Sequence, residues 1–331
     1  MKKTIAIIAG GDSSEHGVSM RSAEGIYSWI DKEKFNVYVV EVNGLDWRVK
    51  TEDNSNPQVN LANFSFNLNG ETIKPDYAYI TIHGTPGENG ILQGYFDLLK
   101  VPYSTCSLFV EALTFNKFAL DQYLKSFGVK VAEDILIRDG NKISPQEIVD
   151  KLGLPCFVKP NEGGSSFGVT KCRSIDDILP AVERASKESP EVLIESLIEG
   201  IEISNGVYGK ADGSVCVLPI TEIVSHNEFF DYGAKYNGEV EEITPARLNE
   251  STTARIKKLT ESIYRVLGAS GIIRVDYFVK KGENGADDTI TLLEINTTPG
   301  MTLTSFIPQQ VAAAGLEMKN VLTEVIEQKL K

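Results

Sequence analysis

Residues 292–300 read Leu-Leu-Glu-Ile-Asn-Thr-Thr-Pro-Gly, an apolar run that ends in a turn signal. Such a run is typical of a buried strand, yet it carries a carboxylate and a carboxamide two positions apart. Because side chains alternate along a strand, Glu294 and Asn296 are expected on the same face. The stretch therefore predicts a strand that presents two oxygen donors where a buried strand would ordinarily carry apolar side chains.

A second strand of this kind is predicted just upstream, at residues 271–279, where Arg274 and Asp276 share a face. If the two strands pair, Asp276, Glu294 and Asn296 converge. A buried charge is costly unless it is paired or binds a metal. Three hard oxygen donors suit Mg²⁺ held between protein and phosphates. A buried ion pair of Arg274 with Asp276 or Glu294 is the alternative, and the two strands leave both open.

The composition limits the classes of protein that need to be considered. The chain has 331 residues, of which 42% are apolar and 24% charged, which is ordinary for a globular protein of two or three domains. The net charge of −13 argues against a nucleic-acid partner, which would need a basic face. The apolar start at residues 4–9 is too short for a signal peptide, and no run approaches membrane-spanning length.

The four cysteines predict reduced thiols rather than a disulfide framework or a zinc site. None forms a Cys-x-x-Cys pair, and each lies in or beside an apolar segment: Cys106, Cys156, Cys172 and Cys216. With only three histidines in the chain, zinc coordination is a poor alternative. The pattern favours a reducing compartment.

Alternating strand and helix patterns in the first hundred residues predict a parallel α/β layer. Strands are expected at 4–9, 35–42 and 76–82, and helices at 16–30 and 91–99, with a hairpin inserted near the Asn-Gly of residues 69–70. Residues 105–196 read as a small α+β unit: helices 114–127, 144–152 and 175–187, and strands 131–137, 155–159, 169–172 and 191–195. The last third adds strands 202–209 and 214–224 and helices 251–268, 307–314 and 318–329.

Four loops are candidates for binding, and each has a plainer structural interpretation. Residues 10–16 and 83–90 are glycine-rich and follow strands, where α/β ligand sites lie, but both could be simple turns. Residues 159–168 combine a lysine with a Gly/Ser tract that could cradle phosphates or serve as a linker. Residues 229–237 are aromatic and carry a lysine, so they could form a lid or a surface-packed loop.

The order of these motifs is more specific than any one of them. Gly-Gly-x-Ser-x-Glu, His-Gly-x-x-Gly-Glu-x-Gly, Lys-Pro with Gly-Ser-Ser-x-Gly, Asp-Tyr-x-Ala-Lys-Tyr, Arg-x-Asp and Glu-x-Asn-x-x-Pro-Gly follow one another along the chain. This series resembles the D-alanine–D-alanine ligases of the ATP-grasp superfamily, from Gly10 to Pro308. The last motif alone would indicate only an ATP-grasp protein.

The resemblance implies an ATP-grasp fold of mixed α/β and α+β class in three domains. They are an N-terminal parallel α/β domain (1–104), a small central α+β lid (105–196) and a C-terminal α+β domain (197–331). The implied activity is ATP-dependent joining of two D-alanines through an acyl phosphate, for peptidoglycan precursors. The implied cofactors are ATP and two Mg²⁺ or Mn²⁺ ions. The implied setting is a cytoplasmic homodimer without membrane or nucleic-acid partners.

The resemblance also assigns the site residues. The metal ligands would be Asp276, Glu294 and Asn296, with Glu294 bridging. ATP would be contacted by Lys117, Lys159, Ser166, Glu195, Glu202 and Lys235. The first D-alanine's ammonium would meet Glu15, which is linked through Ser165 to Tyr236. The second D-alanine's carboxylate would meet Ser305 and Lys235. Arg274 and the Gly300 amide would form the oxyanion hole, and His83 would lie near the substrates.

Three positions depart from the common pattern of that family. Ser196 stands where a lysine often approaches adenine, Phe230 replaces a frequent tyrosine, and Asn116 replaces a frequent aspartate. Tyr236 is retained, which favours D-alanine as the second substrate. A D-alanine–D-lactate ligase, or a ligase for another D-amino or hydroxy acid, is the nearest alternative, and a non-catalytic nucleotide-binding module is a weaker one.

Overall fold

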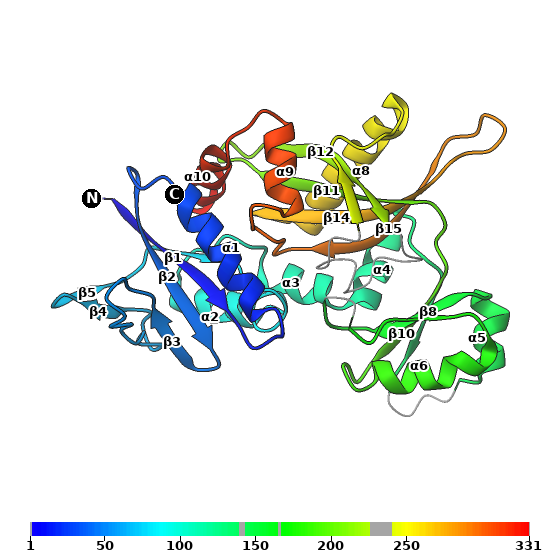
Figure 1. Cartoon of the computed structure of the whole chain (residues 1–331), viewed down its shortest axis with the longest axis horizontal. Coiled ribbons are helices and arrows are strands. Elements are labelled where there is room, and N and C mark those ends of the chain that lie inside the picture. The colour runs from blue at the N-terminus through cyan, green and yellow to red at the C-terminus, as the bar shows by residue number, and fades with distance from the viewer. Residues whose placement is uncertain (1, 139–142, 165–166, 226–239, 331) are drawn as a thin grey trace.

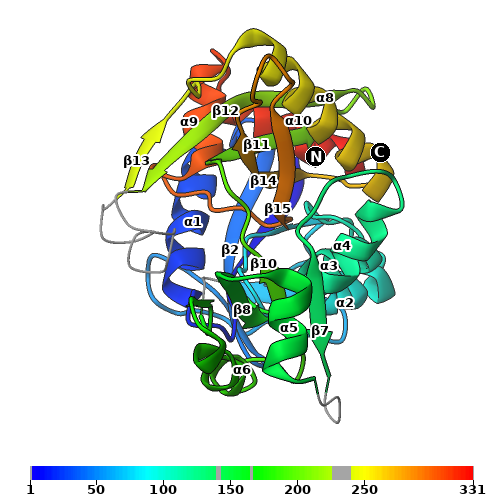
Figure 2. The same ribbon diagram turned by 90° about the vertical axis from the view of Figure 1, so that its right-hand side faces the viewer.

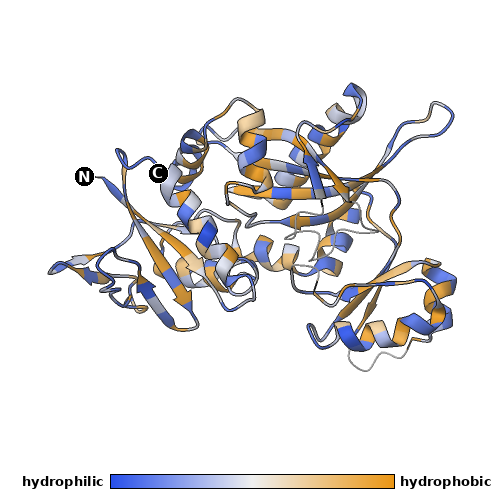
Figure 3. Ribbon diagram, viewed as in Figure 1, coloured by the Kyte–Doolittle hydropathy of each residue, from blue (hydrophilic) through white to orange (hydrophobic). Residues whose placement is uncertain are grey.

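The computed structural model describes residues 2–138, 143–164, 167–225 and 240–330. Within them lie two four-stranded sheets, a five-stranded sheet and a two-stranded hairpin, with helices packed around them (Figure 1). Apolar residues gather along the strands, and hydrophilic ones on the loops and outer helix faces (Figure 3). No helix in these residues is long and apolar enough to cross a membrane.

The first sheet confirms the parallel α/β prediction. Its order is β3-β2-β1-β6, and β1 pairs in parallel with both β2 and β6. The strands are β1 (Lys3–Gly10), β2 (Phe35–Asn43), β3 (Asp46–Val49) and β6 (Tyr77–Ile80), and the helices are α1 (His16–Trp29) and α2 (Ile91–Leu99). The predicted hairpin is present as β4 (Phe66–Leu68) and β5 (Glu71–Ile73). Asn69 and Gly70 form its turn, both with positive φ, as Asn-Gly hairpins require.

The second sheet is antiparallel, with the order β7-β10-β8-β9. Its strands are β7 (Asp134–Ile137), β8 (Cys156–Pro160), β9 (Thr170–Cys172) and β10 (Val192–Ser196). One face packs against α5 (Pro145–Leu152) and α6 (Ile178–Ala185), with the short 3₁₀ turn η1 (Ile175–Asp177) before α6. This unit lies to one side of the first sheet in Figure 1, and Figure 2 views the molecule from the side of this unit, which is then in front.

The helix predicted at 114–127 is wrong as a single element. The chain forms α3 (Leu108–Phe115) and α4 (Lys117–Lys125), with an extended residue, Asn116, between them. The Asn116 side chain accepts a hydrogen bond from the Ala119 amide, so it caps α4. Asparagine is a preferred N-cap because its side chain satisfies a free amide at a helix start.

The third sheet has the order β13-β12-β11-β14-β15 and is antiparallel throughout. Its strands are β11 (Ile201–Gly209), β12 (Val215–Ser225), β13 (Val240–Ile243), β14 (Ile272–Lys280) and β15 (Thr289–Asn296). Helix α8 (Glu250–Leu267) covers one face, where alternate residues of β14 are fully buried. The predicted pairing of β14 with β15 is confirmed, with Asp276 opposite Glu294 and a bulge beside them.

The end of the chain packs back onto its beginning. Helices α9 (Phe306–Ala313) and α10 (Met318–Lys329) share one apolar core with β1, β6 and α1 (Figure 1). Ion pairs at the edge of this core join Lys34 to Glu327 at 3.1 Å and Lys319 to Asp31 at 3.2 Å. The first and third sheets are therefore held together by buried apolar surface, whereas the second sheet has a core of its own.

This shared core makes Leu322 of α10 a sensitive position, since its side chain is fully buried in it. We expect Leu322→Ala to lower the free energy of unfolding by about 2–5 kcal/mol through lost burial and a residual cavity. Urea unfolding measures the difference. The matched control is Leu45→Ala, since Leu45 is 84% exposed. Equal stability of the two variants would contradict the shared core.

Candidate active site

A cavity of about 1420 Å³ opens where the three sheets meet. It is lined by eleven of the residues that the sequence singled out: Glu15, His83, Lys117, Lys159, Glu195, Glu202, Arg274, Glu294, Asn296, Gly300 and Ser305. Asp276 lies just beneath its wall and is 3% exposed. Ser165, Ser166, Lys235, Tyr236 and Phe230 lie outside the described residues.

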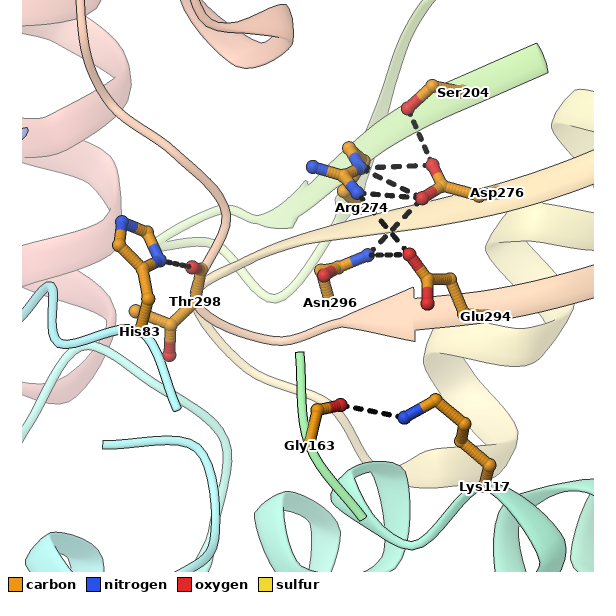
Figure 4. Close-up of polar contacts among 9 residues, drawn as sticks. All are labelled: His83, Lys117, Gly163, Ser204, Arg274, Asp276, Glu294, Asn296 and Thr298. Carbon is orange, nitrogen blue, oxygen red and sulfur yellow. Dashed lines mark hydrogen bonds and ion pairs between the residues drawn. The ribbon is translucent and has the colours of Figure 1, made fainter. Parts of the chain in front are cut away.

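The oxygen donors of β14 and β15 converge as the sequence predicted (Figure 4). The Asn296 Nδ2 donates to Asp276 Oδ2 at 3.2 Å and to Glu294 Oε1 at 3.5 Å. Arg274 makes three hydrogen bonds to Asp276, of which the shortest is 2.7 Å from Nη2 to Oδ2, and its guanidinium lies 3.8 Å from Glu294. Ser204 Oγ donates to Asp276 Oδ1 at 2.7 Å. Asp276 is thus fully hydrogen-bonded.

The sequence left open a buried ion pair of Arg274 and a metal site, and this cluster has the features of both. The ion pair of Arg274 with Asp276 is formed, and although burial opposes it, these carboxylates raise the pKa of Arg274. Of the two carboxylates, Glu294 is the one that faces the cavity. Its side chain is 33% exposed, whereas that of Asp276 is 5% exposed. In the described part of the chain no three His, Cys, Asp or Glu side chains gather as metal ligands. Two carboxylates and a carboxamide fit Mg²⁺ when a ligand supplies further oxygens.

Two lysines face this cluster from the other side of the cavity. Lys159 of β8 lies 2.5 Å from Glu195 of β10, and both are buried. Burial opposes the charge on Lys159, but Glu195 outweighs it and raises the pKa of this amine. Lys117, at the start of α4, donates to the Gly163 carbonyl at 2.7 Å, and burial lowers its pKa. Figure 4 shows Lys117 opposite Glu294, so the cavity lies between cations and oxygen donors.

The loop at residues 83–90 brings a histidine and a carboxyl group to the cavity. His83 Nδ1 lies 2.9 Å from the Thr298 carbonyl, which can only accept, so this nitrogen carries the proton. His83 Nε2 is buried and has no hydrogen-bond partner among the described residues, and burial lowers the pKa of the imidazole. Glu88 accepts from the Gly84 amide at 2.7 Å, and burial raises its pKa to about 7. Glu88 belongs to the glycine-rich motif of residues 83–90, but sequence analysis assigned it no role.

The loop at residues 10–16 contacts the loop at residues 83–90 and lies close to the glycine-rich loop at residues 159–168. Ser13 Oγ donates to the His83 carbonyl at 2.8 Å. Glu15 immediately precedes α1, and the glycine-rich loop of the second sheet comes close to it. A Cβ added to Gly164 would lie only 3.3 Å from Glu15 Oε2. A side chain at that position would therefore require the Glu15 carboxylate to shift by a few tenths of an ångström.

The turn after β15 is held by a carboxyl group that the sequence did not reveal. Glu111 of α3 is fully buried, accepts from the Cys106 amide at 2.9 Å and hydrogen-bonds to the Thr297 hydroxyl. Burial raises the pKa of Glu111 well above its ordinary value. Further along, Ser305 Oγ accepts from the Thr302 amide at 3.1 Å, close to Gly300. Nothing in the sequence distinguishes Glu111 from an exposed helical glutamate.

A cavity between a small antiparallel lid and a larger antiparallel sheet, with buried lysines facing carboxylates, defines the ATP-grasp class of fold. Residues 4–106 match the family described as "D-ala D-ala ligase N-terminus", and residues 123–327 match "D-ala D-ala ligase C-terminus". The chain belongs to the D-alanine–D-alanine ligase family.

Curated relatives and solved structures agree with this assignment. The chain is 60% identical to a D-alanine–D-alanine ligase of Phocaeicola vulgatus and 56% identical to one of Bacteroides fragilis, over 99% of this chain and 100% of each relative. It is similar to the VanG D-Ala:D-Ser ligase of Enterococcus faecalis, with a TM-score of 0.86, 31% identity and 99% of both chains covered. A D-alanine–D-alanine ligase of Bacillus anthracis complexed with ATP gives 0.78 and 26%, covering 99% and 97%.

The buried Glu111 generates a pH-dependent prediction. In the unfolded chain a glutamate loses its proton above its ordinary pKa, near 4.5, whereas the folded protein keeps this one. The folded state then binds more protons, so stability falls as pH rises, by at most about 1.4 kcal/mol per pH unit. Glu111→Gln removes this slope, and its side-chain carboxamide can still hydrogen-bond to the Cys106 amide and the Thr297 hydroxyl.

We therefore expect the stability of Glu111→Gln relative to the unmodified chain to increase from pH 5 to pH 8. Urea unfolding at several pH values measures it. Glu183→Gln, at an exposed position of α6, is the control and should follow the unmodified chain. A difference between Glu111→Gln and the unmodified chain that stays constant with pH would show that Glu111 is ionised in the fold.

Proposed function

We propose that this protein joins two D-alanines to D-alanyl-D-alanine at the expense of ATP, which becomes ADP and phosphate. The observation that carries the proposal is the cavity itself, with the cluster of Asp276, Glu294 and Asn296 on one side and Lys117 and Lys159 on the other. Family membership supports it, since the relatives named above are D-alanine–D-alanine ligases over their full length.

ATP is proposed to lie between the second and third sheets. Lys117 and Lys159 would neutralise its phosphates, and the backbone amides of the glycine-rich loop would cradle them. Glu195 and Glu202 would lie at the adenosine, with Glu202 accepting from the ribose. Ser166 and Lys235 complete the proposed contacts to ATP.

Magnesium fits the donor set of β14 and β15. Asp276, Glu294 and Asn296 would hold the two ions, and Glu294 is the more exposed of the two carboxylates. When bound, the ions would neutralise phosphoryl oxygens and align them for in-line transfer.

The proposed reaction has two steps. A carboxylate oxygen of the first D-alanine attacks the γ-phosphorus of ATP, and the bond from that phosphorus to the β,γ-bridging oxygen breaks, which releases ADP. The amine of the second D-alanine then attacks the acyl carbon, and the C–O bond to phosphate breaks. The amine must lose a proton, and His83 Nε2, which has no hydrogen-bond partner among the described residues, would accept it.

The remaining residues would orient the substrates and stabilise charge. Arg274 and the Gly300 amide would donate to the oxyanion of the tetrahedral intermediate. Glu15 would pair with the ammonium of the first D-alanine, supported by Ser165 and Tyr236. Ser305, with Lys235, would hold the carboxylate of the second D-alanine.

The domain boundaries, assembly and location belong to the same proposal. The three sheets support domains at residues 1–104, 105–196 and 197–331, with α10 added to the core of the first. Location in the cytoplasm is supported by the four free cysteines.

A homodimer is supported by exposed apolar side chains on the adjacent helices α2 and α3: Ile91, Leu98, Leu108 and Phe109. We expect Leu98→Glu with Phe109→Glu to halve the mass measured by sedimentation.

A ligase with a different second substrate is the other candidate. The structural similarity to a D-Ala:D-Ser ligase favours D-serine as an alternative, and D-lactate is the alternative that the sequence left open. A module that binds nucleotide without turning it over is less well supported, because the metal donors and both lysines line one cavity.

The test is phosphate release from ATP with D-alanine alone and with D-alanine plus D-serine or D-lactate. We expect D-alanine alone to suffice and to give the dipeptide.

Glu294→Gln should lower turnover by about 100-fold or more, because one metal-binding charge is lost, with no loss of stability. Glu71→Gln, on the exposed hairpin, is the control. Normal turnover of Glu294→Gln would refute the metal assignment, and phosphate release only with D-lactate or D-serine would refute the substrate.

A further inference from the structure

Asp121 of α4 is a buried carboxyl group in the wall of the cavity. The proposed reaction does not use it. It is 5% exposed and lines the cavity beside Lys159 and Glu195. Among the described residues it makes no hydrogen bond or ion pair that would compensate its burial. A buried carboxylate without a partner is costly, so an unpaired one that faces a ligand cavity needs an explanation.

Asp121 lacks an ion-pair partner within the described part of the chain because the two nearby lysines are paired with other carboxylates. Three carboxyl groups, Asp121, Asp134 and Glu195, lie close to two lysines, Lys125 and Lys159. Each lysine already has a partner. Lys159 is 2.5 Å from Glu195, and Lys125 is 2.7 Å from Asp134.

Asp134 also accepts from Gln122 of α4, so its pairing is complete. Burial, together with repulsion from the Glu195 carboxylate, raises the pKa of Asp121 to about 8. At neutral pH this group therefore carries its proton and offers one donor and one acceptor.

The surroundings of Asp121 suit a flat heterocycle. In the second sheet, Phe157 is paired with Glu195, so both side chains lie on the face that α4 covers. Leu120, Leu197 and Ile198 line the same cavity. A planar base between apolar walls would present its polar edge to the carboxyl groups.

Ser196 stands at the position from which a lysine often approaches adenine in this family, and its short side chain is engaged elsewhere. Its hydroxyl accepts from the Glu133 amide at 3.2 Å, and its own amide donates to the Glu133 carbonyl at 2.9 Å. The serine is thus used to fasten β10 to the segment before β7. The Ser196 side chain is therefore already hydrogen-bonded, and a further polar contact to the base can come from another element that lines the cavity.

We propose that Asp121 determines the base specificity of this site by recognising the 6-amino edge of adenine. Its carbonyl oxygen accepts a hydrogen bond from the exocyclic amine, and its hydroxyl donates to the ring nitrogen beside that amine. This inference rests on the proposed function only in taking the cavity as the nucleotide site. It assigns a residue outside the motifs by which the family was recognised.

The experiment compares the binding of Mg·ATP and Mg·ITP by isothermal titration calorimetry. ITP has the same ribose and phosphates but a carbonyl in place of the 6-amino group. We expect the unmodified chain to prefer ATP, and Asp121→Leu to reduce the ratio of the two affinities by about 10- to 100-fold, because a buried hydrogen-bonding pair is lost. Asp150→Leu, at an exposed position of α5, should leave the ratio unchanged.

A second variant and a pH series guard against misfolding of Asp121→Leu. Asp121→Asn keeps one donor and one acceptor, so it should retain the preference for ATP. In the unmodified chain ATP affinity should fall as pH rises through about 8 and Asp121 ionises, and in Asp121→Asn it should not. The groups that face Asp121 are Glu195 on β10, Lys159 on β8, Asp134 on β7 and Lys125 on α4.

Three results would overturn the proposal: equal losses of ATP and ITP affinity in Asp121→Leu, no initial preference for ATP, or identical pH profiles for Asp121→Asn and the unmodified chain. Each would give Asp121 a structural role only. Because the readout is binding, a chain that binds ATP selectively but releases no phosphate with D-alanine would refute the proposed function and leave the role of Asp121 supported.

Discussion

The antiparallel pairing of β14 with β15 is the interaction on which the site depends. Its register places Asp276 opposite Glu294 and Arg274 opposite Asn296, so four polar side chains occupy one face. The other face of the same strands is buried against α8, and this packing prevents the strands from slipping. A shift of one residue would exchange the two faces, which would bury the charges and expose the apolar residues. The core of the third sheet thus fixes the position of the polar cluster.

Charge around the cavity is balanced locally, pair by pair. Arg274 is matched with Asp276, Lys159 with Glu195 and Lys125 with Asp134, each at 2.5 to 2.7 Å. Pairing of this kind lets a buried site hold many ionisable groups, because each charge has a partner that offsets its desolvation. The groups without such a partner are those with the most to gain from a ligand. His83 Nε2 and Asp121 stand out in this respect among the described residues.

Much of the fold could be predicted from sequence because its strands and helices obey simple periodicities. The paired strands around Asp276 and Glu294, the Asn-Gly hairpin and α10 were all recognisable in this way. The break at Asn116 was not, because the apolar pattern runs through it and only the capping geometry reveals it. Strand β3 was missed because it has four residues, two of them charged, and gains its stability from pairing with β2.

The site was predictable where residues lie in motifs and hidden where they do not. Glu15, His83, Lys159 and Glu294 sit in loops or strands whose composition is unusual, and the structure brings them to one cavity. Glu111 and Asp121 lie in ordinary helices, and their burial depends on which helix face is covered by distant strands. Their importance follows from tertiary contacts, which no local pattern records. Both carry raised pKa values for the same reason, since burial disfavours their charged forms.

The central claim is that Asp276, Glu294 and Asn296 form a divalent-cation site that faces the phosphates of ATP. Anomalous diffraction from crystals grown with Mn²⁺ and a non-hydrolysable ATP analogue tests it most directly. The account predicts anomalous peaks between these three side chains and the phosphates of the analogue. Peaks elsewhere in the cavity, or an analogue bound with Arg274 still closed over Asp276 and no metal beside it, would contradict it.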